Sequence, residues 1–492
     1  MKSVEGKLMK TKKLKFALLF LTFILAVAIM ACSADNKTTD TPDGAINTNE
    51  VEAPAEPETP QISDNLPEDL DFGGSDFRVL NAPSLSWNTV FFVEEQSGDL
   101  IDDAVYLRNA AVESRLNFKI EETLFDDQTV VMNTARKEIL ADSDSFDMAI
   151  LIDRHALNLA QQGLVLPYNK LIYIDLSKEY WSQTLNKDMS IGNKLYFSYG
   201  DYNLTGYEST VTMLFNKKLL QDLNLEDPYK LVLDGKWTFD KFAEMALAAR
   251  ADLNGDGETD RFGYVTLDKH VLPSFWIAAG VRSVKKDEND LPYFSVPGDE
   301  KFGNVYEKIF AVTKGIDSFS GKDPGNDFRQ RMSLFTRATF FEIQRYRDME
   351  DDFGIIPHPK YDENQSQYYV RVGGGSLSIV PVTTPEADKI SAILEALASE
   401  SRKTLIPVYY EVGLQSKFSR DERSEEMLDL IFNHRIYDLG DTYWCDQLRD
   451  GVFAEMFTKD DMNLTSKMES IKASMDRTIQ AAINAFAAIE ID

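Results

Sequence analysis

Residues 252–260 have the residue types and the spacing of a calcium-binding loop. Side chains with oxygen atoms recur at every second position, and Gly257 stands at the sixth position, as in the first half of an EF-hand. Gly263 stands where the closing glutamate of such a loop usually lies, so calcium would depend on Asp260 or on a more distant carboxylate. The sequence predicts a weak structural calcium site, with a polar turn without metal as the alternative. The predicted ligands are Asp252, Asn254, Asp256, Glu258 and Asp260.

A pair of opposite charges follows a predicted buried strand. Asp153 and Arg154 come directly after residues 146–152, which are almost entirely apolar. In open α/β sheets, ligands bind beyond the carboxyl ends of the strands. The pair is therefore the first candidate for a ligand-binding site, and the alternative is a surface salt bridge that contacts no ligand.

The sequence carries no recognisable catalytic motif. Four histidines, at positions 155, 270, 358 and 434, lack metal-ligand spacing, and there is no Gly-x-Ser-x-Gly elbow or phosphate-binding glycine loop. A glycosidase needs only two facing carboxylates, and the 81 acidic residues leave that alternative open. The sequence favours a binding protein over an enzyme.

The N-terminus has the pattern of an export signal. Several lysines, the last of them Lys15, precede an uncharged apolar run over residues 16–30, which ends at Ala31 and Cys32. The run is shorter than the roughly 20 residues of a membrane-spanning helix, which argues against the alternative of a plain transmembrane anchor. The junction resembles a bacterial lipobox, which implies cleavage after Ala31 and attachment of lipid, palmitate included, to Cys32.

The acidic composition limits the partners of this chain. Its formal charge is -29, and loss of residues 1–31 removes six of the 52 basic and one of the 81 acidic residues, which leaves -34. Such a charge repels nucleic acid and anionic lipid surfaces, so it favours a neutral or cationic ligand. Cys445 is the only other cysteine, so the exported chain has no internal disulfide and depends on its core. The length of 492 residues is sufficient for two domains.

Composition and periodicity divide the chain into a tether and an α/β region. Residues 32–72 are rich in Thr, Asp, Glu and Pro, which predicts a disordered acidic tether. Strand and helix patterns then alternate, as in parallel α/β folds, with a helical C-terminus. Predicted strands cover residues 77–80, 118–120, 146–152, 194–197 and 210–215. Predicted helices include one capped by Asp102 and Asp103, and others over residues 129–141, 156–162, 217–223, 239–251, 386–400, 424–432 and 464–488.

Several short motifs follow one another in a characteristic order. They lie at residues 146–155, 163–167, 192–196, 214–217, 235–242, 353–357 and 407–411. Each is weak alone, but together they cover nearly all of the chain after the tether. In this order they resemble family 1 of the extracellular solute-binding proteins of ABC importers.

The resemblance implies an α/β fold with two lobes, of the periplasmic-binding-protein-like type II, with hinge crossings. It places residues 73–205 and 376–421 in one lobe and residues 206–375 and 422–492 in the other. The crossings would lie near residues 202–208, 371–375 and 420–423. The glycines 373–375 suit the middle crossing because glycine tolerates changes in φ and ψ, and the alternative is an ordinary loop.

The resemblance also implies the residues of a ligand site. Similar sugar-binding proteins carry an Asp-Arg pair where Asp153 and Arg154 stand, and Glu208 would accept a hydrogen bond from a sugar hydroxyl. The aromatic faces that stack on sugar rings would come from four residues, each with core packing as the alternative. They are Trp87, Trp276, Tyr346 and Trp444. Trp237, beside the predicted helix cap Thr238, is expected to pack in the core.

The expected protein is a lipoprotein on the extracytoplasmic face of the cell membrane. As a monomer it would capture a carbohydrate, expected to be an oligosaccharide, close on it and present it to the permease subunits of an ABC transporter. The expectation includes no nucleic-acid partner and no cofactor besides structural calcium. The alternatives are a protein that binds a peptide or a polyamine, a carbohydrate-active enzyme, and a surface adhesion protein without an importer.

Overall fold

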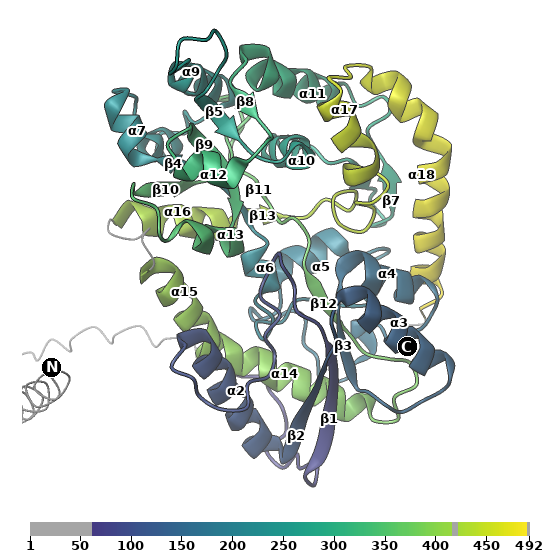
Figure 1. The fold of residues 1–492 in the computed structure, drawn as a ribbon. Coiled ribbons are helices and arrows are strands. Elements are labelled where there is room, and N and C mark those ends of the chain that lie inside the picture. Colours follow the sequence, from purple (N-terminus) through teal and green to yellow (C-terminus); the bar gives the residue numbers. More distant parts are fainter. Residues whose placement is uncertain (1–61, 416–421, 490–492) are drawn as a thin grey trace, which may run out of the picture. The chain divides into compact units, whose positions relative to one another are not determined.

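The computed structural model describes residues 62–415 and 422–489. The predicted signal peptide, Cys32 and most of the predicted tether lie outside these residues. The described chain forms two lobes, each built on one β-sheet (Figure 1). None of its helices, within these residues, combines the length and apolarity that crossing a membrane requires.

The first lobe is built on a four-stranded sheet with the order β12-β3-β1-β2. Its strands are β1 (Ser75–Asn81), β2 (Phe118–Leu124), β3 (Met148–Ile152) and β12 (Ser376–Ile379). β1 pairs in parallel with β2 and β3, and β12 runs antiparallel to β3. The helices around this sheet are α2 (Leu100–Leu116), α3 (Gln128–Leu140), α4 (Asp153–Gln161), α5 (Gln183–Met189), α14 (Ala387–Lys403) and α15 (Leu405–Gln415). Every residue of β3 is buried, in keeping with its apolar sequence.

The second lobe is built on a five-stranded sheet with the order β10-β4-β9-β5-β8. Its strands are β4 (Val211–Asn216), β5 (Phe262–Val265), β8 (Phe319–Ser320), β9 (Ser333–Thr339) and β10 (Phe353–Ile356). β4 is antiparallel to both of its neighbours, while β5 is parallel to β8 and β9. The helices of this lobe are α7 (Lys217–Asp222), α8 (Pro228–Leu233), α9 (Phe239–Ala249), α10 (Asp268–Ala278), α11 (Glu300–Val312), α12 (Pro324–Arg329), α13 (Phe340–Ile343), α16 (Glu422–Asn433) and α17 (Ala454–Thr458).

Short segments carry the chain from one sheet to the other. α6 (Thr205–Glu208) leads into β4, and β11 (Val370–Arg371) leads through glycines 373–375 into β12. A third passage joins α15, which packs on α2, to α16, which packs on β10. Two small sheets, β6 (Val284–Lys286) with β7 (Pro292–Phe294) and β11 with β13 (Arg435–Ile436), and the long α18 (Leu464–Ala487) complete the strands and α-helices of the described residues. α18 runs along the side of both lobes in Figure 1 and contacts β7 and α4.

A close approach of the backbone requires glycine at the second passage. A Cβ atom on Gly375 would lie 2.1 Å from the hydroxyl oxygen of Tyr199. Gly374 has a φ of +111°, which side chains rarely allow, and a Cβ there would lie 2.9 Å from Oδ2 of Asp153. Packing at this point therefore excludes any larger residue.

Local signals set most element ends. The Thr238 hydroxyl accepts from the backbone N–H of Lys241 and caps α9, as predicted, and Trp237 beside it is fully buried. Gly163, with φ of +70°, follows the end of α4 and suits a left-handed helix stop. α2 starts earlier than predicted, because Asp99 caps it, which leaves Asp102 and Asp103 in its first turn.

Two predictions were wrong, one about a strand and one about the extent of the tether. Residues 194–197 form no strand but an irregular segment with one isolated bridge, because their apolar side chains are buried by packing rather than by a ladder. The predicted tether also reaches too far, since residues after 61 lie against the first lobe. Leu66 is buried there, and Asp64 forms an ion pair with Arg115 of α2.

Candidate functional site

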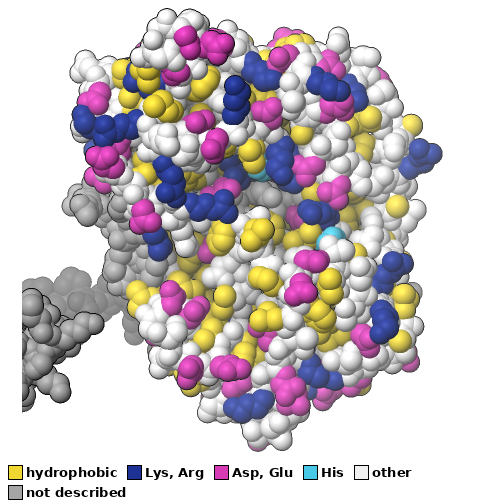
Figure 2. Space-filling model, in the orientation of Figure 1, with side chains coloured by type: hydrophobic (Ala, Val, Ile, Leu, Met, Phe, Trp, Pro, Cys, Tyr) yellow, Lys and Arg dark blue, Asp and Glu magenta, His cyan; other side chains and the backbone are white. Residues whose placement is uncertain are grey.

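A cavity of about 310 Å³ lies between the two lobes. Its walls combine the loop after β1, the first turn of α4, the first turn of α10, the end of β9, β11 with its glycines, and a π-helical turn at Arg449–Phe453. Figure 2 shows this face hollowed across its middle, with Lys and Arg side chains along the hollow. The volume lies near the lower end of the ~300–1,000 Å³ typical of small-molecule sites, so it suits a small polar solute.

Asp153 lies at the carboxyl end of β3, where the chain turns into α4, and lines the cavity. Its backbone N–H donates to the Gly375 carbonyl at 3.0 Å, and its Oδ1 accepts from the Arg154 N–H at 2.8 Å. The side chain is 5% exposed, and this burial raises the pKa of Asp153 to about 7. The carboxyl group is therefore poised between its neutral and charged forms near neutral pH.

Arg154 also lines the cavity but is less constrained. Its side chain is 37% exposed, and its Nε lies 3.5 Å from Oδ2 of Asp446, itself largely exposed. Exposed pairs of this kind contribute little to stability. The guanidinium group is thus free to change partner when a ligand enters.

Trp87 lies in the loop after β1 and forms part of the cavity wall. Its indole N–H donates to the Ser376 hydroxyl at 2.9 Å, which fixes the ring plane against the start of β12. Asn88, the residue after Trp87, donates its backbone N–H to the carboxylate of Glu208. Burial raises the pKa of Glu208 to about 7. Glu208 does not line the cavity, so in this structure it holds the loop that carries Trp87.

The other three aromatic candidates lie in the core. Trp276 is 1% exposed, donates to Asp438 at 3.0 Å and packs on Phe302 and Phe453. Tyr346 packs against Phe328 and Phe353.

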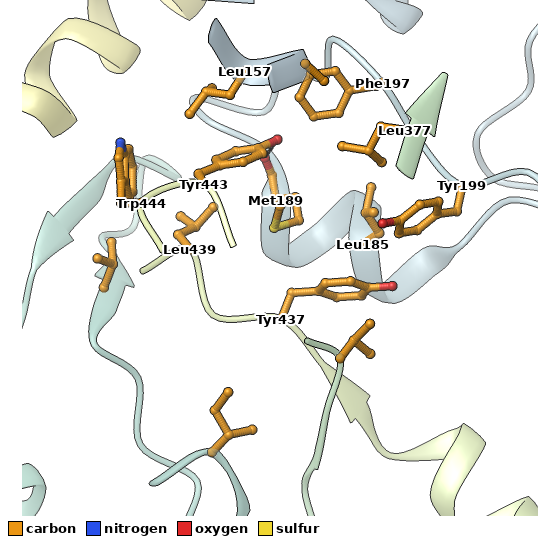
Figure 3. Packing of buried hydrophobic residues seen from close by; sticks show 14 of the residues in the cluster. Leu157, Leu185, Met189, Phe197, Tyr199, Leu377, Tyr437, Leu439, Tyr443 and Trp444 are labelled. Atoms are coloured by element: carbon orange, nitrogen blue, oxygen red, sulfur yellow. Dashed lines mark hydrogen bonds between the residues drawn. The ribbon is translucent and has the colours of Figure 1, made fainter. Parts of the chain in front are cut away.

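Trp444 lies beside Tyr443 among the buried side chains of Figure 3, and it is 1% exposed. None of these three rings lines the cavity, because neighbouring aromatic groups cover their faces. Core packing, the alternative for each of them, is what the structure shows.

The cavity also collects basic side chains that no sequence motif indicated as ligand residues. They are Lys269 and His270 at the start of α10, Arg337 at β9, Arg371 at β11 and Arg449 in the π-helical turn. Only Arg371 carried a signal, because it precedes the glycines of the predicted middle crossing. Apart from the neighbours Lys269 and His270, the others are far apart in the sequence and are brought together by the fold alone.

Buried ion pairs hold two of these arginines. Asp441, fully buried, accepts from Nε and Nη2 of Arg371 at 2.6 and 2.9 Å and from Nη1 of Arg449 at 3.2 Å. Arg449 also pairs through two nitrogens with Asp450, each at 2.9 Å. The shared carboxylate fixes both guanidinium groups at the cavity wall.

His270 lies among these basic residues but is itself uncharged. Burial, followed by Arg337 and Arg371, holds the pKa of His270 well below its ordinary value. The imidazole is therefore neutral at physiological pH, and its buried Nδ1 has no hydrogen-bond partner among the described residues.

The predicted calcium loop lies on the surface of the second lobe, away from the cavity. Asp252 accepts from the N–H groups of Asn254, Gly255 and Gly257, and Asp260 accepts from those of Leu253 and Asn254. Asp256 and Glu258 are exposed. These backbone hydrogen bonds, led by those of Gly257 and Gly255, hold the pKa of Asp252 below its usual value, so the carboxylate is charged.

Among the described residues, a second group of possible metal ligands lies away from loop 252–260. Ligand atoms of Cys445, Asp446 and Asp450 lie within 4.8 Å of one another. Arg154 and Arg449 already contact this group, so cations occupy the places that a metal would need.

A larger groove, of about 940 Å³, lies on the first lobe alone, along α2 and β2. Exposed acidic side chains such as Glu68 and Asp69 line it. Movement between the lobes would not enclose it, so the smaller cavity is the better candidate for solute capture.

The sequence pattern of a family described as "Bacterial extracellular solute-binding protein" matches residues 123–402. No curated protein sequence matches the chain. Solved structures share its fold at low sequence identity. An ABC substrate-binding protein from Listeria monocytogenes in complex with cycloalternan is 11% identical, with a TM-score of 0.56 over 83% of this chain and 99% of that chain.

Two further structures are similar to this chain to the same degree. A cyclo/maltodextrin-binding protein complexed with maltotetraose is 11% identical, with a TM-score of 0.57 over 84% of this chain and 96% of that chain. UgpB from Mycobacterium tuberculosis, in complex with glycerophosphocholine, is 15% identical, with a TM-score of 0.52 over 84% and 98%. At these identities the likeness is one of fold.

Proposed function

We propose that this chain, which belongs to the bacterial extracellular solute-binding protein family, captures a carbohydrate between its lobes and delivers it to the permease of an ABC importer. The observation that carries the proposal is one cavity lined by both lobes, with Asp153 and Trp87 on one side and Arg337 on the other. The relatives bound to cycloalternan and maltotetraose support a carbohydrate as the solute.

Residues of the cavity suit sugar recognition. Trp87 offers an apolar ring face to the C–H-rich side of a sugar, while Asp153 and Arg154 exchange hydrogen bonds with neighbouring hydroxyls. Contacts from both lobes favour the closed form, because a ligand stabilises closure only as far as it binds the closed state more tightly. Capture and release then need no chemical change in the solute.

The proposal includes no catalytic step. The cavity holds carboxyl groups, but Glu342 and Asp450 are engaged by Arg337 and Arg449. The remaining carboxyl, Asp153, has no second free carboxylate facing it for glycoside hydrolysis among the cavity residues. Binding without turnover is the expected behaviour.

The membrane anchor belongs to the same proposal. Lipid on Cys32 would hold the exported chain at the outer face of the membrane, with residues 33–61 as the spacer. The sequence at residues 16–32 supports this, and acylation of Cys32 in the purified membrane-bound protein, detected by mass spectrometry, is the test. We expect a monomer, since one chain supplies both walls of the cavity.

A calcium ion in loop 252–260 is a further part of the proposal. The five oxygen-bearing side chains and the extracellular location, where calcium is plentiful, support it. The ligands would be Asp252, Asn254, Asp256, Glu258 and Asp260, and the ion would pin the loop. Since backbone N–H groups occupy the carboxylates of Asp252 and Asp260, binding would require these hydrogen bonds to rearrange.

The test is a ligand screen on the chain from residue 33 onward. Neutral and acidic sugars, peptides and polyamines are compared by melting temperature and tryptophan emission, because a ligand that binds only the folded form raises the melting temperature. A bound sugar should also contract the molecule in solution scattering. A polyamine or peptide as the sole binder, or turnover of a glycan by the purified protein, would refute the proposal.

A further inference from the structure

Two arginines at the cavity carry buried nitrogens without a partner. Arg371 is 2% exposed, and its Nη1 has no hydrogen-bond partner among the described residues, while its other two nitrogens bind Asp441. Arg337 is 8% exposed and uses Nη1 for Glu342, while its Nε likewise has no partner. A buried donor left unsatisfied costs about 1–3 kcal/mol, and more when it is charged. A ligand that supplies acceptors recovers this cost.

The first turns of two helices, one from each lobe, line the same cavity. α4 begins with Asp153 and α10 with Asp268, and the preceding residues, Ile152 and Leu267, have no oxygen in their side chains to cap the helix. The N-terminus of a helix carries a partial positive charge and favours an anion. The two helix starts therefore add partial positive charge to the cavity wall, which Asp153 and Asp268 in their first turns offset in part.

Lys269 adds a full charge at the start of α10. It is exposed and forms no ion pair with any residue of the described chain. Two of the carboxylates in the cavity wall are already engaged: Glu342 accepts from Arg337 and the Thr339 N–H, and Asp450 accepts from Arg449. The third, Asp153, accepts from the Arg154 N–H, and burial favours its neutral form. Donors without acceptors thus outnumber acceptors without donors at this wall.

We propose that the cavity binds the anionic group of an acidic sugar, with Arg337 and Arg371 as charge-assisted donors to it. The group is a carboxylate, sulfate or phosphate, because each offers several acceptors in the compact geometry that guanidinium groups match. This proposal rests on the proposed carbohydrate function and adds the charge of the ligand. A neutral hydroxyl also accepts hydrogen bonds, but its hydrogen bond to a guanidinium nitrogen is weaker than that of an anion.

The local field runs against the charge of the whole chain. A formal charge of -29 favours a neutral or cationic ligand at long range. Salt screens exposed charges beyond a Debye length of about 10 Å at 0.1 M, whereas buried groups that touch the ligand are screened far less. The groups at the cavity therefore decide which charge binds.

Calorimetry with matched ligands tests the proposal on the full exported chain. Each neutral sugar is paired with acidic counterparts: glucose with glucuronate, glucose 6-phosphate and glucose 6-sulfate, and maltotriose with trigalacturonate. We expect at least one acidic sugar to bind about tenfold or more tightly than its neutral partner, because charge-assisted hydrogen bonds are roughly twice as strong as neutral ones. The arm that binds identifies the anionic group.

The remaining outcomes separate this proposal from the carbohydrate function. If the neutral sugars bind as tightly as their acidic counterparts or more tightly, the proposal of an anionic ligand is refuted, while the proposed carbohydrate function remains supported. Inorganic phosphate or sulfate as the sole binder would overturn both, since no sugar is then recognised. If none of the tested ligands binds, the proposal of an acidic sugar is also refuted.

Substitutions test whether the basic residues of the cavity wall cause the preference for an acidic sugar. Arg337→Gln should weaken binding of the acidic sugar by about ten- to a hundredfold and binding of a neutral sugar by much less, since hydrogen bonds to charged groups are worth about 1.5–3 kcal/mol. Arg331→Gln is the matched control, because Arg331 pairs with Asp351 in the same lobe and does not line the cavity. An equal loss in both variants would contradict the assignment.

Lys269→Gln covers the case in which Arg337→Gln fails to fold. Lys269 is exposed, so its replacement leaves the core intact. We expect a smaller loss of affinity for the acidic sugar, which disappears as the salt concentration rises. A loss of the same size for the neutral sugar would count against an anionic ligand.

Discussion

The cavity wall and the aromatic core of the second lobe each contain a tryptophan in a similar hydrogen-bonding state, yet the two side chains have different roles. Trp87 donates to Ser376 and leaves part of its ring exposed at the cavity, whereas Trp276 donates to Asp438 and is 1% exposed. Phe302 and Phe453 cover the ring of Trp276. Coverage of the ring faces, and not residue type, decides which tryptophan can contact a solute.

The largest effect expected from this contrast is on stability. Trp276→Ala should lower the free energy of unfolding by about 3–5 kcal/mol, because it leaves a large cavity in packed surroundings and removes one of the hydrogen-bond donors to buried Asp438. Urea denaturation measures the change. Trp87→Ala serves as the control and should change stability far less, so equal losses would erase the distinction between the two sites.

The contrast reverses when binding is measured. Trp87→Ala should weaken sugar binding by about five- to tenfold, since an aromatic contact is worth roughly 0.5–1.5 kcal/mol beyond its buried area. Trp87→Phe, which keeps a ring but loses the hydrogen bond to Ser376, should restore part of the affinity. If Trp87→Ala binds sugar as tightly as the unaltered protein, the ring contacts no solute.

Asp153 makes the cavity wall sensitive to pH. Burial raises the pKa of Asp153 in the folded protein to about 7, from an ordinary value of 3.8. A carboxyl group whose pKa is raised in the folded state binds its proton more tightly there, so its contribution to stability is present below about pH 4 and is lost as the pH rises through 7.

Asp153→Asn should therefore gain stability relative to the unaltered protein between pH 5 and pH 8. Melting temperatures across that range give the difference between the two proteins. Asp188→Asn, at a less buried carboxylate outside the cavity, is the control for the loss of one acidic side chain. A constant difference for Asp153→Asn would show that Asp153 stays charged at every pH in this range.

The smallest expected effect is that of calcium on the surface loop. Calcium at millimolar concentration should raise the melting temperature by a few degrees, since a weak site stabilises by mass action only, and a chelator should reverse the shift. Asp252→Asn should abolish the response. Sugar affinity should be unaffected in both cases, because loop 252–260 lies outside the cavity wall. A calcium-dependent change in sugar affinity would mean that the two regions are coupled.

Parts of the fold could be predicted because they depend on local patterns. The buried run before Asp153, the cap at Thr238 and the helix stop at Gly163 each follow from neighbouring residues, and each is observed. The segment 194–197 misled the prediction, because a short apolar run such as Leu195, Tyr196 and Phe197 states what is buried but not whether a neighbouring strand is present.

The candidate site was predicted only in part, for the same reason. Asp153, Arg154 and Trp87 lie at the cavity because they follow strand ends of one sheet, which is a local property. Arg337 and Lys269 are separated from them by more than a hundred residues of sequence, and no local pattern connects them. Packing of the second lobe against the first brings them to one wall.

The sequence by itself determined the family, the α/β alternation, the export signal expected at Cys32 and the charge of the whole chain, because each of these is a sum over the residues or a local pattern. Only the tertiary structure decided which aromatic rings stay uncovered and which charges face the cavity. Burial and pairing depend on distant neighbours, and for this reason an acidic chain can place guanidinium groups at its cavity in which one nitrogen each, Nε of Arg337 and Nη1 of Arg371, lacks a partner among the described residues.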